Sequence, residues 1–381
     1  MPEAVIVDAV RTPIGRAVKG SLKDVRADDL AAVPLKALVD RNPEVDFNET
    51  DDLMMGCGFQ AGEQGYNIGR NAGLLAGIDH HVPATSVNRF CASSLQTIRM
   101  AFHAIVAGEG DQYVAAGVEA VSRFGADNFQ FHPQLDGSEG APYNVYIPMG
   151  ITAENVAERC SVSRESQDEW AAISQQRAVA ARDSGHFDRE IVAVQTADGE
   201  VTRDDGPRPG TTVEKLAELK PAFKPDGTVT AGNACPLNDG AAAVLVMSAE
   251  KAEKLGLKPR ARIIASGVSG LNPEIMGLGP IEACRQALKR AGMTIDDIDL
   301  VEINEAFAAQ VIPSAKHLGI PMEKLNVHGG GIALGHPFGS TGARIMTTLL
   351  NGLEDGGGRY GLETMCVGGG QGMAIIFERL S

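Results

Sequence analysis

The sequence predicts an α/β protein made of two similar halves, and two observations support this prediction. Short β-branched runs alternate with amphipathic helical stretches, a pattern that favours buried sheets covered by helices. The succession of strand, polar loop and helix in TSVNRFCASSLQTIRMAFHAI occurs again in LNVHGGGIALGHPFGSTGARIMTTLL. We therefore expect core domains at 1–120, with returning elements up to about 254, and at 255–381. Such a duplication brings two strand-end loops to a shared site.

In the first half, a buried strand from Ala4 to Val10 is broken by Pro13 and Gly15. Further strands are expected in the runs DLMMGCG, ATSVNRF and QYVAAGV. Helices are expected at Asp28–Asp40 and Ser93–Ala107.

The second half repeats this order. Strands are expected in ARIIASGV, DLVEINE, LNVHGGG and ETMCVGG, and helices at Ile281–Ala291 and Thr341–Leu353. Residues 121–240 differ and form a predicted loop domain. There Ser163 is placed to cap a helix that ends near Gly185, and a hairpin-like run, IVAVQTADGEVTRDD, follows.

Composition excludes several classes of function. A net charge of −15 disfavours binding to nucleic acid or to an anionic membrane, and no apolar run is long enough to span a bilayer. The start, MPEAVIVDAVRTPIG, lacks the features of a signal peptide. Because none of the six cysteines forms a CxxC pair, we expect reduced thiols in a cytoplasmic protein and no metal centre.

Cys91 lies between a predicted strand and a predicted helix. This places its sulfur near a helix N-terminus, where free N–H groups and the helix dipole favour a thiolate. The alternative is a small buried apolar residue, which is what most free cysteines are. The strand–Cys–helix order resembles other nucleophile turns and favours catalysis.

His336 lies in GHPFGSTGAR, a glycine-rich stretch that precedes a helix. It could activate a nucleophile and donate a hydrogen bond to an oxyanion, or it could be an ordinary loop or core histidine. The segment lacks the GxxxxGK[ST] pattern of a phosphate-binding loop. The other seven histidines show no metal-ligand spacing such as HExxH; they are His80, His81, His103, His132, His186, His317 and His328.

Two more segments could carry chemistry. Cys366 precedes a glycine run, Gly368–Gly370, whose bare N–H groups could cradle an oxyanion, and its thiol could serve as an acid and base. A buried spectator is the alternative. Asn304 lies at a strand end before a helix, where it could cap the helix or position a water molecule.

Together these segments resemble the thiolase family over essentially the whole chain. VDAVRTPIGR, VNRFCASSLQ, GITAENVAE, TVTAGNACPLNDGAAAV, NEAFAAQ, GHPFGSTGAR and CVGGGQG recur in the family's order. The resemblance implies a five-layered α-β-α-β-α arrangement of two βαβαβ core domains with an inserted loop domain. It also implies thiolytic cleavage of 3-ketoacyl-CoA to acetyl-CoA and a shortened acyl-CoA, by a reversible Claisen reaction.

The resemblance also implies roles for individual residues. Cys91 would be the acylated nucleophile, Cys366 the acid and base, and His336 the group that activates Cys91. His336 and a water held by Asn304 would form one oxyanion hole, and the N–H groups of Cys91 and Gly368 the other. Coenzyme A would be a substrate and not a tightly bound cofactor, and no metal is required. Residues expected to contact it are Arg208, Cys235, Met149, Phe223, Phe307 and Ala231.

The subtype rests on one departure and on the segment GHPFGSTG, which also resembles the degradative enzymes. Biosynthetic acetoacetyl-CoA thiolases carry a His-Met-Gly segment near the acyl pocket, whereas this chain has Pro148, Met149 and Gly150. This resembles the degradative 3-ketoacyl-CoA thiolases of fatty-acid β-oxidation. His328 stands where asparagine is more usual, and the sequence offers no account of it.

Other functions are open at this point. They are a biosynthetic thiolase, a decarboxylating condensing synthase, a non-catalytic acyl-CoA or lipid carrier on the same scaffold, and a cysteine protease. A synthase has no use for a second cysteine, and a protease explains neither Cys366 nor the duplication. The family resemblance further implies a homodimer or homotetramer whose partners are small acyl-CoA molecules.

Overall fold

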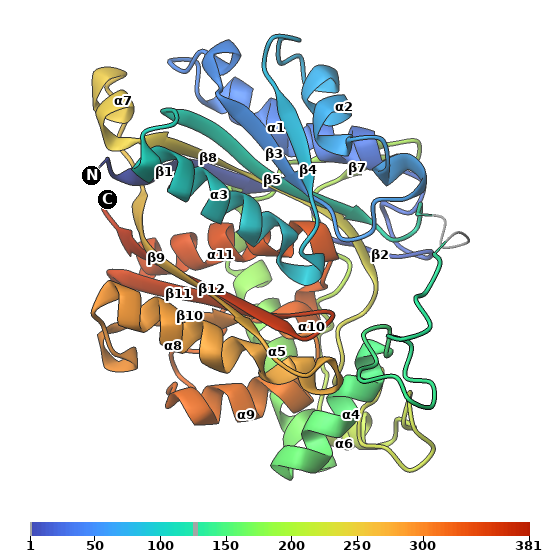
Figure 1. Cartoon of the computed structure of the whole chain (residues 1–381). Coiled ribbons are helices and arrows are strands. Elements are labelled where there is room, and N and C mark those ends of the chain that lie inside the picture. The colour runs from blue at the N-terminus through green and yellow to red at the C-terminus, as the bar shows by residue number, and fades with distance from the viewer. Residues whose placement is uncertain (1, 125–128) are drawn as a thin grey trace.

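A computed structural model describes residues 2–124 and 129–381, and it confirms the predicted α/β class (Figure 1). Within the described residues, ten strands form one mixed sheet in the order β10-β11-β12-β9-β1-β8-β5-β3-β4, with the short β2 beside β8. Their bounds are β1 Ala4–Arg11, β2 Gly15–Arg16, β3 Asp52–Gly56, β4 Ala84–Val87, β5 Gln112–Ala120, β8 Asn238–Ser248, β9 Ala261–Gly270, β10 Leu300–Ile303, β11 Tyr360–Val367 and β12 Gln371–Arg379. The strands β6 (Val194–Thr196) and β7 (Gly199–Val201) form a separate hairpin in the predicted run.

The strand pairing repeats in the two halves. In the first, β1, β8 and β5 pair antiparallel in turn, and β5, β3 and β4 pair parallel. In the second, β9, β12 and β11 pair antiparallel, and β11 and β10 pair parallel. The halves join where β1 meets β9, at Val5 opposite Arg262 and Ile6 opposite Ala261.

The predicted strand LNVHGGG is wrong. Only Leu325 pairs with the sheet, through a single parallel bridge to Val301. The next residue, Asn326, has φ +46° and turns the chain away. Its side-chain amide then accepts from the N–H of Ile303 and donates to the carbonyl of Ile303, each at 2.9 Å. A side chain therefore supplies the pairing that a strand backbone would have made.

The helices form three layers around the two halves of the sheet (Figure 1). Helices α1 and α2 cover the outer face of the first half, and α8 and α9 that of the second. Helices α3 and α11 lie between the halves, in one apolar cluster with strands of both. The bounds are α1 Ala27–Arg41, α2 Ile68–Leu75, α3 Ser93–Ala107, α4 Met149–Cys160, α5 Arg164–Asp183, α6 Val213–Ala217, α7 Ala249–Lys254, α8 Gly279–Ala291, α9 Ala308–Leu318, α10 Gly331–Leu334 and α11 Thr341–Gly356.

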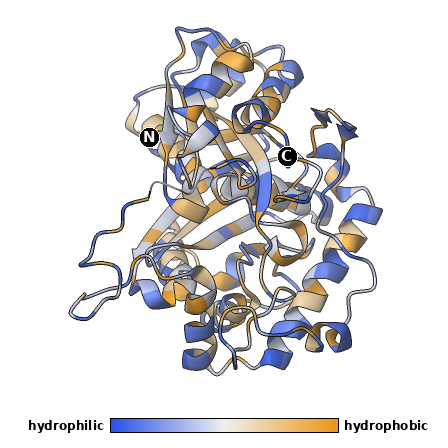
Figure 2. Cartoon of the chain, turned by 90° about the vertical axis from the view of Figure 1, so that its right-hand side faces the viewer, coloured by the Kyte–Doolittle hydropathy of each residue, from blue (hydrophilic) through white to orange (hydrophobic). Residues whose placement is uncertain are grey.

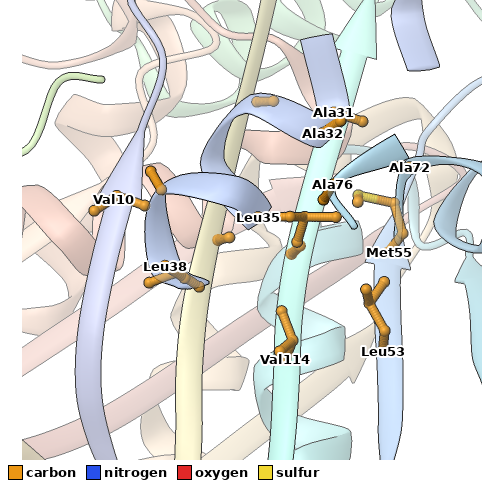
Figure 3. Packing of buried hydrophobic residues seen from close by; sticks show 14 of the residues in the cluster. Val10, Ala31, Ala32, Leu35, Leu38, Leu53, Met55, Ala72, Ala76 and Val114 are labelled. Carbon is orange, nitrogen blue, oxygen red and sulfur yellow. The ribbon is translucent and has the colours of Figure 1, made fainter. Parts of the chain in front are cut away.

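Apolar packing fixes these layers. Figure 3 shows Leu35 and Leu38 of α1 over Val10 of β1 and Val114 of β5. In the central layer, Leu95 of α3 is fully buried, as are many of its neighbours on α11. Each such side chain contributes about 1.5–3 kcal/mol when removed from water. Figure 2 shows hydrophilic residues on the outward faces of the peripheral helices, as this burial requires.

The central helices meet at their N-termini. The N–H of Ala343 in α11 donates to Ser94 Oγ of α3 at 3.0 Å. A Cβ on Gly342 would lie 2.3 Å from the nitrogen of Leu95, so only glycine allows this approach. The loops preceding the two helices, which carry Cys91 and His336, are thereby brought to one place.

The segment between the halves packs mainly beside the second half (Figure 1). Its α5 begins after Ser163, whose Oγ accepts from the N–H of Ser166 at 3.1 Å, as predicted. Trp170 of α5 is buried in the cluster of α8 and α9. Of the helices in the described ranges, none combines the length and apolar character needed to cross a bilayer.

Candidate active site

Cys91 lies in a 3₁₀ turn, Phe90–Ala92, between β4 and α3, as the sequence predicts. The turn is strained, because Phe90 has φ +44°, and it is held by hydrogen bonds. Asn88 Oδ1 accepts from the N–H of Phe90 at 2.8 Å, and Ser93 Oγ donates to the carbonyl of Phe90 at 2.6 Å. The turn presents the Cys91 sulfur at the N-terminus of α3, where only 8% of the residue is exposed.

Burial opposes the thiolate that the helix end favours. Burial raises the pKa of Cys91 to about 12, although the backbone N–H groups of Gly368 and of Cys91 itself lower it. The cost of desolvating the thiolate exceeds the stabilisation that these two N–H groups provide. Cys91 is therefore a neutral thiol that needs a base, and two backbone donors already face its sulfur.

Cys366 lies near the end of β11 and is fully buried. Burial raises the pKa of its thiol well above the usual range, and the neighbouring Cys91 sulfur acts in the same direction. Gln310 opposes this, because its Nε2 donates to Cys366 Sγ at 2.8 Å. The fold thus brings together two thiols that lie 366 − 91 = 275 residues apart.

His336 is a buried neutral imidazole with a defined tautomer. Burial lowers its pKa to about 3, with Arg344 acting in the same direction. Its Nδ1 lies 2.6 Å from Thr341 Oγ1, and that hydroxyl donates to the carbonyl of Pro337 at 2.8 Å. Because the hydroxyl proton is used there, Thr341 accepts from Nδ1–H, and Nε2 carries the free lone pair. The opposite tautomer would lose the Pro337 hydrogen bond.

Asn304 completes this group. Its Nδ2 lies 3.2 Å from His336 Nε2, as a donor to the free lone pair. Its Oδ1 is buried and has no hydrogen-bond partner among the described residues. The backbone of His336 is fixed separately, because its N–H donates to Asn238 Oδ1 at 2.9 Å.

A buried carboxylate, Glu119 at the end of β5, ties the surrounding loops together. It accepts from the N–H groups of Gly58 at 2.8 Å and Gly339 at 2.9 Å, and from Gln64 Nε2 at 2.7 Å. Burial raises its pKa, and these donors oppose the shift. Glu119 thus fixes the loop after His336 against the loop after β3.

The residues predicted to contact coenzyme A fall into two groups. Cys235, Met149 and Phe307 join Cys366 in one apolar cluster, and Phe223 packs edge-on against Phe307 with ring centroids 6.0 Å apart. Arg208 and Ala231 instead line a cavity of about 170 Å³ that also borders Arg16 and Asn238. This cavity therefore borders the residue that fixes the backbone of His336.

The sequence did not single out four residues of this site: Gln310, Thr341, Asn238 and Glu119. Gln310 and Thr341 lie inside motifs that did attract notice, NEAFAAQ and GHPFGSTGAR. Each is a polar residue at a position that the helical pattern buries, next to a candidate residue, and this combination could have identified them. Asn238 also lies inside a quoted motif, TVTAGNACPLNDGAAAV, whereas nothing local marks Glu119, since its partners are distant in sequence.

Two buried thiols and a neutral imidazole on a duplicated α/β scaffold are suited to thiol-dependent acyl transfer. The comparisons agree, because residues 4–250 match the family model for the thiolase N-terminal domain and residues 257–379 match that for the C-terminal domain. The chain therefore belongs to the thiolase family, a family of acyltransferases, as predicted.

Individual relatives extend over the whole chain. It is 51% identical to the 3-ketoacyl-CoA thiolase of Pseudoalteromonas translucida and 49% identical to that of Idiomarina loihiensis, with both sequences covered completely. The crystal structure of the Bacillus anthracis acetyl-CoA acetyltransferase superposes with a TM-score of 0.91 at 40% identity. That match covers 100% of this chain and 99% of the other.

Proposed function

We propose that this chain cleaves 3-ketoacyl-CoA with coenzyme A, giving acetyl-CoA and an acyl-CoA shortened by two carbons. The observation that carries the proposal is the meeting of Cys91 and Cys366, one from each half of the scaffold, at a single buried site. The names of the full-length relatives from P. translucida and I. loihiensis support the choice of substrate.

In the first step, Cys91 Sγ attacks the C3 ketone while His336 Nε2, once the Asn304 amide has turned away from it, takes the thiol proton. The C2–C3 bond then breaks, and its electron pair stays on C2 as the enolate of acetyl-CoA. The Cys366 thiol gives its proton to C2, which releases acetyl-CoA and leaves an acyl thioester on Cys91. Both thiols begin this step protonated, in agreement with their raised pKa values.

In the second step, the Cys366 thiolate removes the proton of an incoming coenzyme A thiol. That sulfur attacks the acyl carbonyl, and Cys91 leaves and recovers its proton from His336. The N–H groups of Gly368 and Cys91 would stabilise one oxyanion, and His336 with a water held by Asn304 the other. Each such donor is typically worth about 2.7–4 kcal/mol of transition-state stabilisation.

Apolar surroundings support chains longer than acetoacetyl. Met149 at the start of α4 packs in the cluster that contains Phe307, Cys235 and Cys366. Pro148 supplies no polar side chain beside it, in contrast to the histidine of biosynthetic relatives. Arg208, exposed at the mouth of the adjacent cavity, is suited to a phosphate of coenzyme A. We also propose a cytoplasmic homodimer or homotetramer.

The test is thiolysis with coenzyme A across a series of 3-ketoacyl-CoA lengths, with Cys91→Ala and Cys366→Ala measured alongside. We expect comparable kcat/KM for short and long chains and no acyl-enzyme with Cys91→Ala. Cys366→Ala should lose turnover, and an acyl group loaded on its Cys91 from an acyl-CoA should stay trapped. Full turnover by Cys366→Ala would remove the proposed acid and base.

A biosynthetic acetoacetyl-CoA thiolase is the second candidate, and the B. anthracis acetyl-CoA acetyltransferase favours it through its name and its fold. Activity confined to acetoacetyl-CoA would establish it. A carrier would instead acylate Cys91 once without turnover.

A further inference from the structure

A second group of ligand-type side chains lies at the far end of α11. Asp355 is on the last turn of this helix, whereas the active site is at its first turn, roughly 21 Å away at 1.5 Å per residue. His186, in the 3₁₀ turn after α5, and His328, in the loop after Leu325, meet Asp355 there. The group takes no part in the chemistry proposed above.

The three side chains are close and ordered. His186 Nδ1 lies 2.8 Å from Asp355 Oδ2, and the rings of His186 and His328 stack with centroids 3.6 Å apart and planes 9° apart. The His328 ring rests on α11 at Gly352, where a Cβ would lie 2.9 Å from its Cε1. One ligand atom from each residue lies within 4.8 Å of the others.

Burial and a cavity beside the group favour a bound ion. The His186 side chain is only 4% exposed, and it presents Nδ1 to Asp355, so this ring edge is fixed next to the carboxylate. The group also faces a pocket of about 310 Å³ lined by Ser184, Gly185, His186, Arg189, His328 and Asp355.

We propose that His186, His328 and Asp355 bind a divalent transition-metal ion such as Zn²⁺ or Ni²⁺. Two imidazoles and one carboxylate are a common ligand set for these ions. Ligand atoms about 2.1 Å from such an ion are spaced roughly 3 Å apart, close to the separation of His186 Nδ1 and Asp355 Oδ2. Arg189 Nη2, 2.9 Å from Asp355 Oδ1, holds the carboxylate in place from the other side.

Binding requires one movement. The lone pair of an imidazole lies in the ring plane, so two parallel rings cannot both direct a lone pair at one ion. His186 is held by Asp355 and by its burial, whereas His328 is partly exposed and faces the pocket. The His328 ring therefore tilts out of the stack, and the ion links the turn after α5 to the end of α11.

One other group of ligand-type side chains occurs in the described ranges. Asp79, His80 and His81 are consecutive and all exposed. Their side chains all lie at the surface and not beside a buried pocket, so we interpret them as an ordinary exposed turn. In a titration they would nevertheless compete for metal, as would the reactive thiol Cys91.

The test is isothermal titration with Ni²⁺ and Zn²⁺ in a parent variant, Cys91→Ala with His80→Ala and His81→Ala. Two substitutions are then added singly: His328→Phe, which keeps a stacked ring without nitrogen, and Asp355→Asn, which keeps the size without the charge. His317→Ala is the matched control, because His317 binds only a local carbonyl, that of Pro313, in the contacts described.

We expect one ion per chain in the parent and in the His317→Ala control, with a raised melting temperature when metal is added. Affinity should fall at least 10-fold in His328→Phe and in Asp355→Asn. Nitrogen-15 imidazole resonances of His186 and His328 should shift or broaden with Ni²⁺. No uptake by the parent, or unchanged affinity in both variants, would overturn the proposal. If His328→Phe fails to fold, Asp355→Asn and the imidazole resonances of the parent decide.

Discussion

Replacing Thr341 with valine tests the tautomer assigned to His336. Valine has nearly the same shape, but it offers no acceptor for the Nδ1–H group, which Thr341 Oγ1 now accepts at 2.6 Å. The proton is then better placed on Nε2, where the Asn304 amide can turn to accept it across the 3.2 Å contact. In that form His336 has no lone pair for the Cys91 proton.

The size of the effect follows from these contacts. A buried donor without an acceptor costs about 1–3 kcal/mol. Since about 1.4 kcal/mol is a factor of ten in rate, Thr341→Val should slow acylation of Cys91 by about 10- to 100-fold. Stability should change little, because the Pro337 carbonyl still accepts from the N–H of Ser340 at 3.0 Å.

The assay is single-turnover acylation of Cys91, followed by mass spectrometry, with Thr341→Ser as the matched control. Serine keeps the hydroxyl and should acylate at close to the original rate. If Thr341→Val acylates within twofold of the original protein, the hydroxyl does not set the tautomer and the argument fails.

Three more predictions rest on single contacts. Gln310→Leu should raise the pKa of Cys366, which makes its thiol a weaker acid toward C2 and should slow the acylation of Cys91 by 3-ketoacyl-CoA about 10-fold; unchanged acylation would contradict this. Glu119→Gln should lower the free energy of unfolding, measured in urea, by about 3 kcal/mol, because an amide cannot accept from all the N–H groups that now donate to the carboxylate. A loss below about 1 kcal/mol would contradict this role of Glu119. Burial raises the pKa of Asp52 to about 6 in the folded protein. Its ionisation therefore destabilises the fold increasingly as the pH rises above the ordinary pKa of 3.8. Asp52→Asn should raise the melting temperature at pH 8 and change it little at pH 4, and the reverse order would refute this prediction.

Local patterns predicted the elements that depend on local sequence. Helix α3 begins and ends at the predicted residues, because its apolar spacing is helical and Gly108, with φ +74°, ends it. The strand expected in LNVHGGG failed because a side chain, that of Asn326, took over the pairing. A run of β-branched and glycine residues does not reveal such a substitution.

The site was predicted in part for the same reason. Cys91, His336 and Cys366 were found because each lies at a boundary between elements. The raised pKa of Cys91 was not, because burial depends on residues from both halves. His186 and His328 lie 328 − 186 = 142 residues apart, so no spacing rule could join them.

The long segment between β5 and β8 leaves and rejoins the sheet at one place. Ala120, the last residue of β5, pairs with Asp239 near the start of β8, so 239 − 120 − 1 = 118 residues depart and return between adjacent positions. The cost of closing a loop grows only slowly with its length. The long segment therefore adds little strain to the pairing of β5 with β8, the register that places Glu119 opposite Gly240 beneath the candidate site.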